Sequence, residues 1–210
     1  MKIPEHPIFL ESVEFIRNQI GVTGLNRFQQ LVLERIIHSS GDLNIQSFLR
    51  FSPNACEDAI CALRKGATIL TDTHMAEAAV APVAKRTMNS NVRCILEMAP
   101  EFLEPSSKTR SSAGMQKIWS DLEKEEESLV GPVVLIGSAP SALMTLLDLV
   151  NEGFKRPSLI IGMPVGFIGV SECKNRLLNT DVSHIVLEGS RGGASIAAAT
   201  VNALLRAAEI

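Results

Sequence analysis

The sequence has little aromatic and little basic character. It contains no tyrosine and one tryptophan in 210 residues, and its net charge is −3 at neutral pH. A surface that stacks nucleic-acid bases needs aromatic side chains, and a surface that binds phosphate backbones needs an excess of lysine and arginine. We therefore expect no nucleic-acid partner.

Long apolar segments and paired cysteines are missing as well. No run approaches the roughly 20 apolar residues of a membrane-spanning helix, and the first residues lack the apolar core of a signal peptide. The four cysteines form no C-x-x-C pair and have no histidine at the spacing of a zinc site. They are Cys56, Cys61, Cys94 and Cys173. We expect reduced thiols, no membrane association and a cytoplasmic location.

The common catalytic and cofactor motifs are absent too. The chain has no Walker-type phosphate loop, no G-x-G-x-x-G after an apolar run, no G-x-S-x-G elbow and no H-E-x-x-H pair. Its four histidines are scattered. We therefore expect neither a metal nor a cofactor. A proton-assisted rearrangement suits a chain with these residues and without these motifs better than metal or redox chemistry.

The apolar residues that are present indicate an α/β fold. Hydrophobic residues make up 46% of the chain, enough for one domain with a sizeable core over residues 1–210. The first 65 residues show helical periodicity, and short β-rich runs then alternate with helical stretches. The expected strands are 67–72, 92–96, 132–137, 157–162 and 183–187, and the later helices about 73–87, 109–128, 140–152, 171–179 and 193–208.

This alternation predicts a three-layer αβα domain with a mainly parallel sheet of about five strands, preceded by an N-terminal helical segment. Residues 100–112 have the composition of one long polar loop. Ligands of such sheets bind beyond the carboxyl ends of the strands. Here those ends carry turns of small residues at 71–75, 137–141, 162–169 and 189–193. These turns either present backbone N–H groups to anions or are simply tight connections.

His38 is the best candidate for proton chemistry. It ends a predicted helix in the segment Arg35-Ile-Ile-His38-Ser-Ser-Gly-Asp42, one turn after Arg35. A helix C-terminus favours the imidazolium by about 0.3–1 kcal/mol, and Arg35 opposes it unless a substrate carboxylate takes up its charge. The pattern alone is equally typical of an ordinary polar helix end.

Two other residues are weaker candidates. His74 follows Asp72 at a strand end and would be an alternative acid. Arg191 lies among small residues, where it would either bind an anion or cap the turn after the last strand.

Five stretches, taken in order, carry a family resemblance. They are Ile36-Ile-His-Ser-Ser-Gly41, Arg50-Phe-Ser-Pro53, Thr109-Arg-Ser-Ser112, Pro164-Val-Gly-Phe-Ile-Gly-Val-Ser-Glu172 and Arg191-Gly-Gly193. From about Ser12 to Leu205, the chain resembles the precorrin-8X methylmutase family, which includes the cobalt-precorrin-8 methylmutases.

The resemblance implies an isomerase of cobalamin biosynthesis. Such enzymes move a methyl group from C11 to C12 of the corrin precursor, giving cobyrinic acid or its metal-free counterpart without a redox cofactor. The family's catalytic histidine falls on His38, which would protonate the macrocycle and then recover the proton. Ser12 and Arg35 fall on substrate contacts, and Arg110 on an arginine expected to meet a substrate carboxylate. The resemblance also implies a homodimer.

Two departures from the family pattern lie in turns. Ser138 and Ala194 stand where the family often has asparagine and serine, which affects substrate preference more than reaction class. Both the metal-free and the cobalt-containing substrate are compatible with the sequence. A non-catalytic corrinoid carrier of the same fold is the main alternative, and the glycine-rich turns alone would also fit an unrelated binder of phosphate esters.

Overall fold

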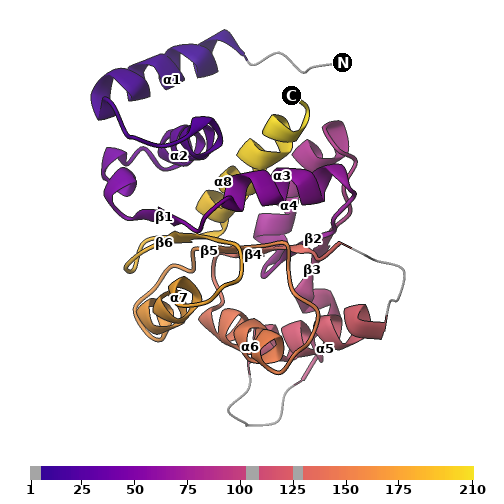
Figure 1. Cartoon of the computed structure of the whole chain (residues 1–210). Coiled ribbons are helices and arrows are strands. Elements are labelled where there is room, and N and C mark those ends of the chain that lie inside the picture. Colours follow the sequence, from indigo (N-terminus) through magenta and orange to yellow (C-terminus); the bar gives the residue numbers. More distant parts are fainter. Residues whose placement is uncertain (1–5, 103–108, 125–129) are drawn as a thin grey trace.

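The fold is built on one six-stranded sheet. The computed structural model describes residues 6–102, 109–124 and 130–210 (Figure 1). The strands are β1 (Leu49–Phe51), β2 (Ile69–Thr71), β3 (Val92–Cys94), β4 (Val133–Ile136), β5 (Leu159–Gly162) and β6 (His184–Leu187). Their order across the sheet is β1-β6-β5-β4-β2-β3. All neighbours are parallel except β1 and β6.

Helices cover both faces of this sheet. They are α1 (Pro7–Ile20), α2 (Arg27–Ser40), α3 (Ala55–Arg64), α4 (His74–Arg86), α5 (Arg110–Lys124), α6 (Pro140–Asn151), α7 (Val170–Leu178) and α8 (Ala194–Ala208). Two short 3₁₀ helices, η1 (Leu43–Ser47) and η2 (Ile95–Met98), complete the description. No helix within the described ranges is both long and apolar enough to cross a membrane.

The sequence prediction of five strands is wrong by one. The five predicted runs are β2 to β6, and the missed strand is β1, which pairs antiparallel with β6. It has only three residues, with Leu49 buried and Arg50 exposed, so it lacks the continuous apolar run that marks a parallel strand buried on both faces. Arg50 forms an ion pair with Glu188 just beyond β6.

The predicted loop over 100–112 also needs correction. Helix α5 begins at Arg110, so the last three residues of that segment are helical. Residues 103–108 lie outside the described residues, as do 125–128 at the end of the helix predicted over 109–128.

The three-layer architecture is confirmed, and the alternation of side chains along each strand explains it. Val133 and Leu135 of β4 point into a core shared with α2, α3, α4 and α8. Val134 and Ile136 point into a second core shared with α5, α6 and α7. Figure 1 shows these two groups of helices on opposite sides of the sheet. The N-terminal helical segment adds to the first side, because α2 packs on α8 and α1 packs on α2.

A polar clamp joins α1 to α2. The buried carboxylate of Glu34 accepts hydrogen bonds from Arg17 Nε and Nη2, at 2.6 and 3.0 Å, and from Gln30 Nε2 at 2.9 Å. Helix α2 begins at a capping box between Asn26 and Gln29. It ends at Gly41, which adopts the left-handed conformation with φ of 69°. The clamp and the caps together fix which residues of α1 lie beside the last turn of α2.

Asp72 organises the carboxyl edge of the sheet. Its Oδ2 accepts three backbone hydrogen bonds from the turn between β4 and α6, namely from Gly137, Ser138 and Ala139, at 3.0, 2.6 and 2.8 Å. The side chain is fully buried. Burial raises the pKa of Asp72 above its ordinary value, although these hydrogen bonds act in the opposite direction. The three N–H groups of this turn are therefore already bound by a side chain of the protein, Asp72.

We predict that Asp72→Ala lowers the free energy of unfolding by about 2–4 kcal/mol, because three backbone N–H groups, two of them buried, lose their acceptor. Asp72→Asn keeps an acceptor oxygen and loses less. A raised folded-state pKa means that this carboxyl favours folding most at low pH, and that the contribution is lost as pH rises through the folded-state pKa. The deficit of Asp72→Asn therefore shrinks as pH rises above about 4.

Denaturant unfolding between pH 4 and pH 8 measures these differences, and Asp181→Asn at an exposed position is the control. Equal stabilities of the alanine and asparagine variants would contradict the assigned role.

Candidate active site around His38

His38 lies in the last turn of α2 with its side chain exposed to solvent. Its Nδ1 is 2.8 Å from the hydroxyl oxygen of Ser12, which comes from α1. The ring of Phe9 meets the imidazole edge to face, with 4.9 Å between centroids and 81° between planes. The structure thus brings together two of the residues that the sequence predicts for the site, although 26 positions separate them.

Arg35 joins this group through the same aromatic ring. Its guanidinium carbon lies 3.8 Å from the centroid of Phe9, a distance typical of a cation–π contact. Arg35 and His38 are one helical turn apart on α2, so Phe9 contacts both. Phe9 is a residue that sequence reasoning missed, since one phenylalanine at helical spacing indicates only an apolar helix face.

Two hollows flank this cluster. One of about 400 Å³ is lined by Arg35 and His38 of α2, Ala79 and Val83 of α4, and a strip of α8. The strip consists of Ser195, Ala198, Ala199, Asn202 and Arg206. The other, of about 560 Å³, lies among α1, α2 and the end of α8. Arg35 and Arg206 line both hollows, so two guanidinium groups lie along the shared wall.

Arg206 was also missed by sequence reasoning. The Ala-rich α8 indicated only a packing helix, and nothing in its sequence marks the arginine near its end as different from an ordinary solvated residue. Its position follows from α2 packing on α8. The hollow beside His38 is therefore lined by small residues, two arginines and one imidazole. This lining suits an apolar ligand that carries carboxylates.

The turn after β6 is tied to the segment that follows His38. Arg191 Nε lies 3.3 Å from a carboxylate oxygen of Asp42, and its guanidinium carbon is 4.6 Å from the Phe48 ring centroid. The hydrogen bond from the Asn44 N–H, more than the charge of Arg191, lowers the pKa of Asp42. Of the two roles open to Arg191, the structure favours an internal bridge over a site for a ligand anion.

A buried lysine holds the same turn from beneath. Lys174 of α7 donates hydrogen bonds from Nζ to the carbonyls of Gly189 and Arg191, both at 2.7 Å. Burial lowers the pKa of Lys174 to about 8. These carbonyls face a protein cation, and the N–H groups of the turn after β4 face Asp72. The expectation that the turns present N–H groups to a substrate anion therefore does not hold for the turn after β4, whose N–H groups already bind Asp72.

The two positions that depart from the family pattern lie in turns that touch each other. A Cβ on Gly137, next to Ser138, would be 2.7 Å from the Cα of Ala194. The backbones of the two turns are therefore in direct contact, and only glycine fits at position 137.

Arg110 is not brought to His38 within one chain. It is the first residue of α5, exposed, and its Nε donates to the Pro100 carbonyl at 3.2 Å. Helix α5 covers the opposite face of the sheet from α2 (Figure 1). Arg110 lines neither of the hollows beside His38.

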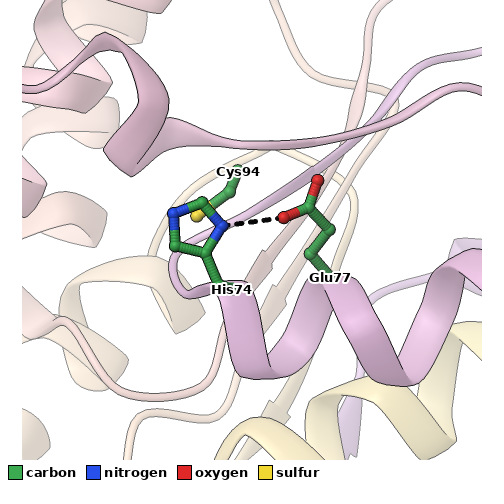
Figure 2. A group of neighbouring side chains, drawn as sticks. All are labelled: His74, Glu77 and Cys94. Carbon is green, nitrogen blue, oxygen red and sulfur yellow. Dashed lines mark hydrogen bonds and ion pairs between the residues drawn. The ribbon is translucent and has the colours of Figure 1, made fainter.

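His74 has a different set of neighbours from those that its sequence position indicates. Asp72 turns away toward residues 137–139, and His74 Nδ1 instead meets a carboxylate oxygen of Glu77 at 2.9 Å. The thiol of Cys94 completes the group, with one ligand atom from each residue lying within 4.8 Å of the others (Figure 2). Spacing rules could not find this cluster, because Cys94 comes from a separate strand. The sequence does indicate that β2 and β3 are parallel strands, and pairing them would have brought Cys94 close to the start of α4.

Comparison with known proteins places this geometry in a family. The family model of precorrin-8X methylmutase matches residues 7–207. A cobalt-precorrin-8 methylmutase of Synechocystis is 34% identical, over 96% of this chain and 95% of the relative. A precorrin-8X methylmutase of Pseudomonas aeruginosa is 36% identical, over 94% and 93%.

A solved structure agrees with this match. The precorrin-8x methyl mutase of Thermus thermophilus superimposes with a TM-score of 0.84 and 32% identity, over 97% of this chain and 98% of that one. A family match that spans nearly the whole sequence, together with relatives and a fold of the same name, leads to one conclusion: the chain belongs to the precorrin-8X methylmutase family.

Proposed function

We propose that this protein is an isomerase of cobalamin biosynthesis that moves a methyl group from C11 to C12 of precorrin-8 or cobalt-precorrin-8. The product is cobyrinic acid, with or without cobalt. The observation that carries the proposal is the contact between His38 and Ser12 at the rim of a hollow lined by two arginines. This arrangement supplies a proton donor and partners for carboxylates in a chain of the methylmutase family.

In this mechanism His38 donates a proton to the macrocycle. The added positive charge lowers the barrier to migration, the bond from the methyl carbon to C11 breaks, and a bond to C12 forms. His38 then recovers the proton, so the reaction needs no external oxidant or reductant. Ser12 engages Nδ1, which leaves Nε2 as the nitrogen that faces the substrate.

The arginines hold the substrate. Arg35 and Arg206 lie on the wall between the two hollows, where each guanidinium can pair with a carboxylate of the corrin periphery. The alanines of α4 and α8 leave a smooth apolar surface for the ring. Pairing of Arg35 with a carboxylate removes its repulsion of the imidazolium, so binding makes His38 a better-placed acid.

We predict that His38→Ala abolishes most of the turnover, with kcat reduced on the order of 10²–10⁴-fold, the usual contribution of a general acid–base group. Tetrapyrrole binding, followed by absorbance, is retained because the arginines remain. His74→Ala is made in parallel and tests the alternative acid, a second exposed histidine. An inactive wild type that binds tetrapyrrole would identify a carrier, and unchanged turnover in His38→Ala would contradict the catalytic role.

Ser12→Ala tests the orientation of the imidazole. Loss of one hydrogen bond worth about 0.5–1.5 kcal/mol predicts a two- to tenfold lower kcat. Ser12→Thr keeps a hydroxyl and is expected to restore most of the rate. Steady-state kinetics separates this effect from weaker binding, since a merely structural role would change KM or stability and would not be rescued by threonine.

We further propose that the active form is a homodimer in the cytoplasm. Phe167 and Ile168, in the glycine-rich turn before α7, are 88% and 91% exposed, which is typical of side chains that pack against another chain. The four cysteines are free thiols, as is usual in a reducing compartment. In such a dimer, Arg110 reaches a carboxylate of the substrate bound at the partner subunit's His38.

Mixed dimers test this arrangement. His38→Ala and Arg110→Ala subunits, each poorly active alone, are unfolded together, refolded and assayed. If the residues act across the interface, half of the dimers are mixed and contain one intact site of two, so activity returns to about one quarter of the wild-type value. No recovery, with a dimer confirmed by light scattering, would place both residues in the same subunit's site.

Parallel assays with metal-free and cobalt-containing substrate identify which of the two is the natural substrate.

A further inference from the structure

The carboxyl ends of β2 and β3 bring three different metal-binding side chains together. His74 and Glu77 occupy the first turn of α4 at i and i+3, and therefore lie on one helix face. Cys94 is the last residue of β3 and lies in register with Thr71 of β2. Figure 2 shows the imidazole joined to the carboxylate of Glu77, with the sulfur of Cys94 overlapping the ring in this view.

We propose that His74, Glu77 and Cys94 bind a zinc-class divalent cation, with water as the fourth ligand. Nitrogen, sulfur and carboxylate oxygen are the ligand types that zinc takes in proteins. The three ligand atoms lie within 4.8 Å of one another. In a tetrahedral zinc site, ligand atoms are about 3.3–3.8 Å apart, so shifts of roughly an ångström or less complete the geometry.

The three side chains differ in exposure, and this difference allows such a shift. Cys94 is fully buried at the end of its strand, which gives the site a fixed anchor. The side chain of His74 is 61% exposed, so its ring can turn toward the sulfur and leave an open side for water. Glu77, with 23% exposure, links the two.

The charges of the cluster suit a cation. A divalent cation bound here would displace the thiol proton of Cys94 and would contact the carboxylate of Glu77 directly. The positive end of the α4 dipole opposes a cation only weakly, compared with the attraction of a thiolate and a carboxylate in direct contact.

This site is separate from the proposed catalytic chemistry. None of its three residues lines a hollow beside His38. The cation would join the start of α4 to the edge strand β3. One turn further along, α4 carries Ala79, and then Val83, which both line the His38 hollow. The inference does not depend on the proposed methyl transfer, and its test uses no tetrapyrrole.

The experiment is a titration of the full-length chain, free of any histidine tag, with Co²⁺ and then Zn²⁺ after chelator treatment under reducing conditions. We expect one equivalent of Co²⁺ to produce a near-ultraviolet thiolate-to-cobalt charge-transfer band and the intense visible bands of four-coordinate cobalt. Zn²⁺ displaces the cobalt and raises the Tm. His74→Ala and Glu77→Gln weaken binding tenfold or more, and Cys94→Ser removes the charge-transfer band and weakens binding on the order of 100-fold.

The control is Cys61→Ser, because Cys61 is the exposed cysteine and a possible adventitious ligand. This variant is expected to keep the band and the affinity. A band that persists in Cys94→Ser, or that vanishes in Cys61→Ser, overturns the assignment. If Cys94→Ser does not fold, His74→Ala decides the question, since unchanged affinity at this exposed position would equally overturn it.

Discussion

The site around His38 depends on one polar interaction, the clamp between Arg17 and Glu34. Helix α1 packs mainly on α2 and η1, and only two of its residues, Val13 and Ile16, are buried. Such a small apolar face does not fix the orientation of α1 on α2. The two hydrogen bonds from Arg17 to the buried carboxylate of Glu34 fix it instead. Because Arg17 and Ser12 belong to the same rigid helix, fixing one also fixes the other beside His38. Loss of Arg17 would leave the buried carboxylate of Glu34 without its cation, which makes this attachment specific.

Charges inside the protein also decide where a ligand can bind. In this fold class, the carboxyl edge of the sheet is the usual binding place. Here Asp72 occupies the N–H groups after β4, and Lys174 occupies the carbonyls after β6. Both interactions hold the turns in place, and the hydrogen-bonding groups that they use are not available to a ligand. Arg35 and Arg206, on the helices above the sheet, are the arginines that line the hollow beside His38.

The sequence predicts the parts of the fold that repeat a simple pattern. Strands β2, β4, β5 and β6 are recognisable because strands buried on both faces are nearly continuous apolar runs. Strand β1 is not, since three residues with one exposed arginine carry no such signal. The end of α2 at Gly41 follows from local capping chemistry. The start of α3 at Ala55 does not, because the side chain of Asn54 before it makes no capping hydrogen bond.

The site is predictable only in part, because its contacts join distant segments. His38 stands out by residue type, while Ser12 and Arg35 gain meaning only from the family resemblance. Phe9 and Arg206 have ordinary patterns, and only the packing of α1 and α8 against α2 reveals them. The cluster at His74 combines a helix turn with the end of a neighbouring strand, so no linear spacing describes it.

Phe9 has a further consequence for the entropy of binding. An arginine side chain loses up to about 2 kcal/mol of rotamer freedom when it is ordered. Phe9 already restrains Arg35 on its face and His38 at its edge before any ligand arrives. Much of that ordering therefore accompanies folding, so that the groups of the proposed site would need little further immobilisation when a ligand binds.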